Sequence, residues 1–110
     1  MMQSDLAQFT GTEHYYKYLF GTKLTDGVKY LAEMAGAYWF LDVICSWQPE
    51  IKSPPFQVWK LNKCGDGWLV TCEDGNDNEL CRQVVEYSDF PMPSAEVWFI
   101  DGVMLLPSEY

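Results

Sequence analysis

Few side chains in this sequence are suited to acid–base, nucleophilic or metal chemistry. His14 is the single histidine and stands between Glu13 and Tyr15. With these two neighbours, we expect His14 on the surface or rim of the domain. The chain has no HExxH, GxSxG, Walker-type phosphate loop or GxGxxG motif. We therefore predict that it has no catalytic residues and is not an enzyme.

The cysteines offer a second kind of chemistry. Cys45 lies in an apolar run, where a cysteine is typically a small core residue. Cys64, Cys72 and Cys81 could meet across neighbouring strands and, with His14, supply four zinc ligands. Structural zinc sites take cysteines two to four residues apart, whereas the gaps here are seven and eight residues. We interpret the cysteines as packing residues and expect neither a metal nor another cofactor.

The run from Asp74 to Glu79 is similar to the start of a calcium-binding loop, with oxygen-bearing side chains at its first, third and fifth positions. Such a loop needs glycine at position six and a bidentate acid at position twelve. Glu79 and Val85 occupy these two positions. The sequence therefore indicates a polar hairpin turn, which is a common use of aspartate, asparagine and glycine.

Charge is distributed unevenly along the chain. Residues 1–63 contain six basic and six acidic side chains and sum to zero. Residues 64–110 contain ten acidic side chains and one basic side chain, Arg82, so one minus ten gives the whole net charge of -9. Alternate residues on a strand lie about 6.8 Å apart, so acids on one strand face form a coarse array of negative charge. Such an array favours a basic protein partner and weakens as salt screens it.

The same acidity excludes two classes of function. Direct binding to nucleic acid or to an anionic membrane requires clustered lysine and arginine, which this chain lacks. The first residues carry no basic segment followed by an apolar one, so we expect no secretory signal, a cytoplasmic location and reduced cysteines. At 110 residues, we expect a single domain spanning 1–110.

The first part of the chain, to about residue 48, is predicted to be helical. Thr25-Asp26-Gly27 opens one helix, which ends or bends at Gly36, and a second helix runs from Ala37 to Trp47. The aromatic segment Tyr15–Phe20 fits a helix or an edge strand, and we favour a helix ending at Gly21. Three prolines in residues 49–55 predict an irregular connection.

After the prolines the pattern changes to a period of two residues, which is typical of strands. Residues 56–61, 68–73, 80–87, 96–100 and 103–106 are the expected strands, and Asp101-Gly102 is expected to form a tight turn. The acidic part, 56–110, is therefore rich in strands. The predicted fold is α+β, with two or three N-terminal helices packed on one face of a C-terminal antiparallel meander of four to five strands.

The segment Thr25-Asp26-Gly27-Val28-Lys29-Tyr30-Leu31 resembles that of a family of small uncharacterised bacterial domains, some carried on mobile elements. Gly36-Ala37-Tyr38-Trp39-Phe40-Leu41-Asp42 and Phe9-Thr10-Gly11-Thr12-Glu13 extend the resemblance over most of the chain. The family has no assigned activity, so the resemblance implies no site residues. Its mobile-element context, together with the acidity of this chain, implies a function as a small inhibitor of host defence nucleases, such as an anti-CRISPR or anti-restriction protein.

These observations predict a non-catalytic, acidic protein-binding domain. As an inhibitor it would mimic nucleic acid and occupy the basic, nucleic-acid-binding groove of a defence complex. Its carboxylates would accept hydrogen bonds from lysine and arginine. The candidate binding residues are Asp66, Glu73, Asp74, Asp77 and Glu79.

Two alternatives stay open. One is a small enzyme or ligand-binding protein with an aromatic pocket near His14. The other is a housekeeping interaction domain whose acidity serves solubility. The aromatic residues available to the pocket are Tyr15, Tyr16, Tyr18, Phe20, Tyr38, Trp39 and Phe40.

Overall fold

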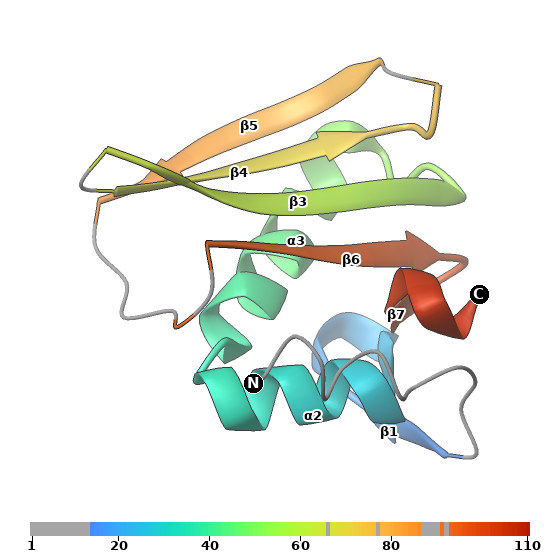
Figure 1. Cartoon of the computed structure of the whole chain (residues 1–110). Coiled ribbons are helices and arrows are strands. Elements are labelled where there is room, and N and C mark those ends of the chain that lie inside the picture. The colour runs from blue at the N-terminus through green and yellow to red at the C-terminus, as the bar shows by residue number, and fades with distance from the viewer. Residues whose placement is uncertain (1–13, 66, 77, 87–90, 92) are drawn as a thin grey trace.

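The computed structural model describes residues 14–65, 67–76, 78–86, 91 and 93–110 and is dominated by a seven-stranded sheet. In chain order its elements are β1 (Tyr15–Lys17), the 3-10 helix η1 (Leu19–Gly21), β2 (Lys23–Thr25), α2 (Asp26–Ala35), α3 (Tyr38–Ile51), β3 (Phe56–Cys64), β4 (Gly67–Glu73), β5 (Glu79–Val85), β6 (Ser94–Ile100), β7 (Val103–Leu105) and the 3-10 helix η2 (Pro107–Glu109). Figure 1 shows α3 behind the sheet and η2 in front of it.

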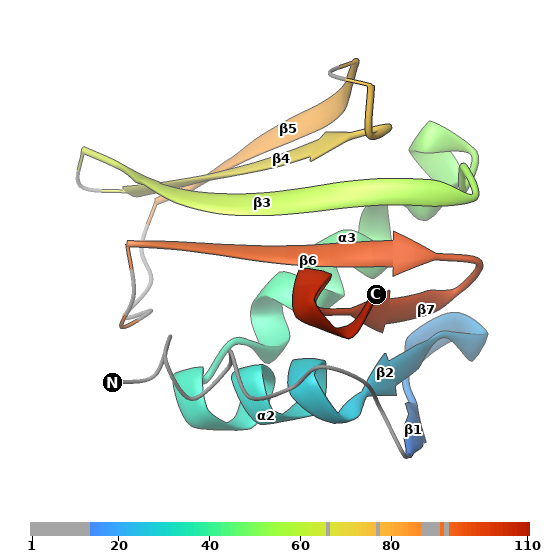
Figure 2. The same ribbon diagram turned by 45° about the vertical axis from the view of Figure 1, so that its right-hand side comes forward.

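The sheet is mixed. Its strand order is β1-β2-β7-β6-β3-β4-β5, so β3 lies between β4 and β6. The β2–β7 pair is parallel, whereas the other five pairs are antiparallel. In both ribbon views the β4–β5 connection, the start of β3 and the β6–β7 turn lie at the same end of the sheet (Figures 1 and 2).

The predicted architecture of N-terminal helices on a four- to five-stranded antiparallel meander is wrong. Tyr15–Lys17 and Lys23–Thr25 are strands, and β2 pairs in parallel with β7 from the far end of the chain. A strand of three residues is too short to display a period of two, and a pairing between such distant segments leaves no local signal. The aromatic composition of Tyr15–Phe20 is nevertheless typical of a strand.

The predicted boundaries of α2 are confirmed. Thr25 is its N-cap and accepts a hydrogen bond from the Val28 N–H at 3.4 Å. Gly36 ends the helix in the left-handed conformation, with φ at 60°, and its N–H donates to the Ala32 carbonyl. Among the described residues, no helix is both long enough and apolar enough to cross a membrane.

The second helix is longer than predicted, because α3 continues through Pro49 to Ile51. Proline lacks the N–H that would bond four residues back, so regular structure was not expected there. The helix nevertheless completes another turn. Lys52 ends it in the left-handed conformation, and its N–H donates to the Gln48 carbonyl. The Gln48 side chain adds a hydrogen bond to the Ile44 carbonyl at 2.8 Å. The irregular connection is therefore shorter than the predicted 49–55.

The core lies between the two α-helices and one face of the sheet. On β3 the side chains of Gln57, Trp59 and Leu61 alternate toward the helices and are fully or almost fully buried. Phe40 of α3 is equally buried against them. On the opposite face of the sheet, near η2, Phe56, Trp98 and Tyr110 form an aromatic cluster.

The C-terminal segment is tied to the start of α2 by one carboxylate. Glu109 accepts hydrogen bonds from the Thr25 hydroxyl at 2.6 Å, the Gly27 N–H at 3.1 Å and the Leu106 N–H at 2.8 Å. Negative charge is favourable at this end of a helix, where N–H groups have no partner within the helix. The Thr25-Asp26-Gly27 segment thus both begins α2 and holds the C-terminus.

Candidate binding site

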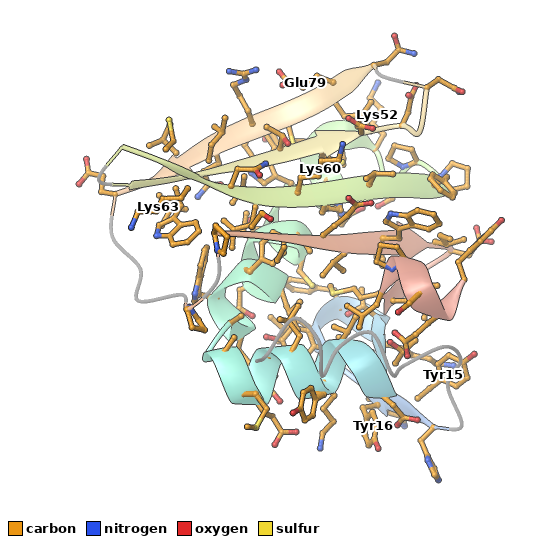
Figure 3. All side chains as sticks on the ribbon, in the orientation of Figure 1. Tyr15, Tyr16, Lys52, Lys60, Lys63 and Glu79 are labelled. Atoms are coloured by element: carbon orange, nitrogen blue, oxygen red, sulfur yellow. The ribbon has the colours of Figure 1, made fainter. Side chains whose placement is uncertain are left out.

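Three of the five predicted binding residues lie in the part of the chain that the structure describes. Glu73 ends β4, Asp74 follows it, and Glu79 begins β5. We call these three carboxylates the acidic turn; Asp66 and Asp77 lie outside the described residues. Figure 3 shows Glu79 on β5 and Lys60 on β3, two strands away in the sheet.

Asp74 organises the backbone of the turn. Its carboxylate accepts hydrogen bonds from the Asn76 N–H at 2.8 Å, the Asn78 N–H at 3.3 Å and the Asn78 side-chain amide at 3.0 Å. These donors stabilise the charged form, so the pKa of Asp74 is held below its usual value and the group is ionised at neutral pH. Asp74 is therefore a structural residue of the turn as well as a source of charge.

Each of the two glutamates has a basic neighbour. Arg82 binds Glu79 through two nitrogens, at 3.0 and 2.7 Å, and this hydrogen bonding lowers the pKa of Glu79. The Lys60 ammonium lies 3.6 Å from the Glu73 carboxylate. Three acids against these two bases leave a local charge of -1 among the described groups. The acidic turn is thus a cluster of mixed sign with an excess of carboxylate.

The strand register places two carboxylates opposite each other. Glu73 pairs with Glu79 next to an irregularity between Cys72 and Glu73. Like charges directly opposite on a sheet are destabilising. Here each glutamate is paired with its own basic neighbour, Glu73 with Lys60 and Glu79 with Arg82.

A pocket of about 730 Å³ opens at the end of the sheet where the acidic turn lies, on the face that the helices cover. We call it the end pocket. Its wall comes from η1, the C-terminal half of α3, the proline-rich connection, the start of β3 and the β6–β7 turn. Phe20, Pro49, Pro54 and Phe99 supply apolar surface. Ligand pockets have similar volumes and a similar apolar character with a few polar groups.

A saturated amide forms one wall of the end pocket. The Gln57 side chain is 1% exposed. Its oxygen accepts from Gln48 at 2.9 Å and from the Trp59 indole at 2.8 Å, and its nitrogen donates to Gln48 at 2.8 Å and to the Pro54 carbonyl at 3.0 Å. A primary amide has two donors and two acceptor positions, so every one of them is used. This network fixes the wall and leaves Gln57 no capacity to bind a ligand.

The alternative site near His14 lies elsewhere. The imidazole is 69% exposed and its Nδ1 stands 4.0 Å from the Asp26 carboxylate, at the start of α2. Its ring contacts Tyr16 at a centroid distance of 6.5 Å. His14 does not line the end pocket, so the structure does not bring the histidine together with that cavity.

The three cysteines considered as zinc ligands do not converge. Cys72 and Cys81 face each other across β4 and β5, whereas Cys64 is exposed at the end of β3. In the described part of the chain, no group of three or more histidine, cysteine or acidic side chains is placed to hold a metal ion. Cys45 is buried, as expected for a core residue, and its thiol lies 3.8 Å from the Thr22 hydroxyl.

Alkylation of the native protein with iodoacetamide near pH 8 is expected to modify Cys64 first. Burial raises the pKa of Cys45 and Cys72, and it raises that of Cys81 to about 11. Because the thiolate is the nucleophile, only about one Cys81 side chain in a thousand would be reactive at this pH. Peptide mass spectrometry should show one rapid site that Cys64→Ser removes. A second site reacting as rapidly would contradict the described burial.

The sequence pattern carried partial signals for the end pocket. Gln57 occupies an inward position of the alternation Gln57, Trp59, Leu61, and a polar residue there is an anomaly that marks a buried hydrogen-bond network. The sequence marks Asp101 as a turn residue and Phe20 as one of many aromatic residues, and neither pattern indicates a pocket. Their meeting at one cavity depends on the β2–β7 pairing, which the sequence did not reveal.

The protein thus has a mixed sheet backed by helices, and its two candidate sites, the acidic turn and the end pocket, lie at one end of the sheet. The chain belongs to a family of unknown function (DUF6876), whose model matches residues 1–110. No curated protein and no solved structure matches the chain.

Proposed function

We propose that the protein is a non-catalytic binding domain that docks its acidic turn onto a basic surface of another protein. The observation that carries the proposal is the concentration of the whole net charge of -9 in residues 64–110. The acidic turn lies in this part of the chain, and its three carboxylates exceed their two basic neighbours, Lys60 and Arg82, by one charge.

The ion pair between Glu79 and Arg82 is exposed enough for a basic side chain of another protein to replace Arg82. Glu79 is 44% exposed and its partner Arg82 is 62% exposed. Exposed pairs of this kind contribute little to stability, so an arginine or lysine of a partner can replace Arg82 at low cost. The new pair would be shielded from water inside the interface, where a charge-assisted hydrogen bond is stronger.

We further propose that the protein is an inhibitor and that it occupies the nucleic-acid-binding groove of a defence nuclease. Such grooves concentrate lysine and arginine to neutralise phosphates, which makes them complementary to an acidic domain. We place the encounter in the cytoplasm, a reducing compartment that suits the free thiols of Cys72 and Cys81.

An affinity capture from cells that produce the protein tests the proposal. The bait is compared with a turn variant (Glu73→Gln, Asp74→Asn and Glu79→Gln) and with a matched variant (Glu33→Gln, Glu50→Gln and Glu86→Gln) that changes the net charge equally. The native bait and the matched variant should retain one basic protein that a salt gradient elutes early, and the turn variant should lose it. Equal recovery on all three baits would contradict the proposal, as would a partner that resists high salt.

A further inference from the structure

Phe20 adopts a backbone conformation that its side chain does not favour. Its φ and ψ are 56° and 35°, in the left-handed region that glycine and asparagine tolerate but bulky residues rarely occupy. Its side chain is 84% exposed, so it contributes almost nothing to the core. A strained residue whose side chain does not stabilise the fold points to a role in binding.

The exposed ring stands at the rim of the end pocket. Phe20 is one of its lining residues, together with Asp101 and Gly102 of the β6–β7 turn. The two segments are joined directly, because the Lys23 N–H donates to the Gly102 carbonyl at 2.9 Å. Phe20 and Asp101 therefore border the same cavity, and an aromatic ring and a carboxylate both attract cations.

The charge and the polarity of the lining restrict the ligand. Asp101 is the single charged residue among those lining the end pocket, so an anionic ligand would be repelled. Pro49, Pro54 and Phe99 present apolar surface, while the Gln57 amide is already saturated. The interior therefore suits an apolar body, and the rim suits a positive charge.

We infer that the end pocket binds a small organic cation, with its apolar body between Phe99 and the proline-rich connection and its charged group between Phe20 and Asp101. This site is separate from the acidic turn. The volume of about 730 Å³ is ample for an arylalkyl amine.

The test is a nuclear magnetic resonance titration of the isotope-labelled full chain with phenethylamine at neutral pH and constant ionic strength. Phenethyl alcohol and hydrocinnamate serve as the neutral and anionic counterparts. Phenethylamine should shift the amide signals of Thr22, Phe99 and Gly102 with a Kd on the order of 1 mM, as expected for a ligand of this size. Hydrocinnamate should bind at least about tenfold more weakly.

Two variants separate the contacts without disturbing the backbone. Asp101, with φ at 48°, lies in the left-handed region like Phe20, and asparagine tolerates that region. Asp101→Asn should remove the preference for the amine over the alcohol, and Phe20→Asn should weaken phenethylamine binding by about tenfold. Glu79→Gln, in the acidic turn, should leave the titration unchanged. Any of three results would overturn the inference. Phenethylamine could cause no shifts at the end pocket, or hydrocinnamate could bind as tightly as phenethylamine. Alternatively, Asp101→Asn could keep the native preference for phenethylamine over phenethyl alcohol.

Discussion

Replacement of Gln57 by leucine is expected to lower the free energy of unfolding by about 3 kcal/mol, because one buried and two half-buried groups lose their partners at once. The Trp59 indole N–H, the Pro54 carbonyl and the Gln48 amide all bond the Gln57 side chain. Leucine fills a similar volume, so the loss reports the hydrogen bonds rather than an empty cavity. Urea denaturation followed by tryptophan fluorescence measures the change.

Gln83→Leu is the matched control for this substitution. Gln83 lies on β5 and accepts one hydrogen bond, from the Trp47 indole at 2.8 Å. Its replacement orphans one partly buried donor and should cost about 1 kcal/mol. If Gln57→Leu is no more destabilising than Gln83→Leu, the amide network does not hold the wall of the end pocket.

Replacement of Glu109 by alanine is expected to destabilise the protein by about 2 kcal/mol, because its carboxylate bonds three donors around the start of α2. Gly27→Ala should act through the same contact. A β-carbon at Gly27 would stand 2.7 Å from the Glu109 carboxylate oxygen and 2.7 Å from a Leu106 methyl group, so it must displace both.

A double-mutant cycle distinguishes this contact from a general effect of alanine in the helix. Alanine is favoured over glycine within helices by about 1 kcal/mol. Gly27→Ala should therefore destabilise the native protein but cost clearly less, or nothing, in the Glu109→Ala background, where only Leu106 remains in the way. Additive effects of the two substitutions in thermal or urea unfolding would rule out the proposed link between the C-terminus and α2.

The elements with a local signature could be predicted from the sequence. The capping residue Thr25 and the terminal Gly36 define α2, and alternation predicts the five C-terminal strands. The β6–β7 turn at Asp101-Gly102 was also visible as an aspartate–glycine dipeptide. In these cases the determinants of structure are neighbours in the chain.

The topology could not be predicted, because it depends on contacts between distant segments. The parallel pairing of Lys23 with Val103 and of Leu24 with Met104 brings η1 against the β6–β7 turn. The part of the end pocket lined by Phe20, Asp101 and Gly102 depends on that pairing, so these residues carried no common signal in the sequence. The carboxylates of the acidic turn could be proposed as binding residues because charge can be counted in the sequence. The positions of Lys60 and Arg82 beside them required the register of β3, β4 and β5.

The most direct test of the central claim is the association rate constant of the captured partner with the native protein, the turn variant and the matched variant, measured at low and at moderate salt. The account predicts that the native protein and the matched variant associate rapidly and slow steeply as salt rises, while the turn variant associates slowly with a weak salt dependence. Equal rate constants for the turn variant and the matched variant, at both salt concentrations, would contradict it.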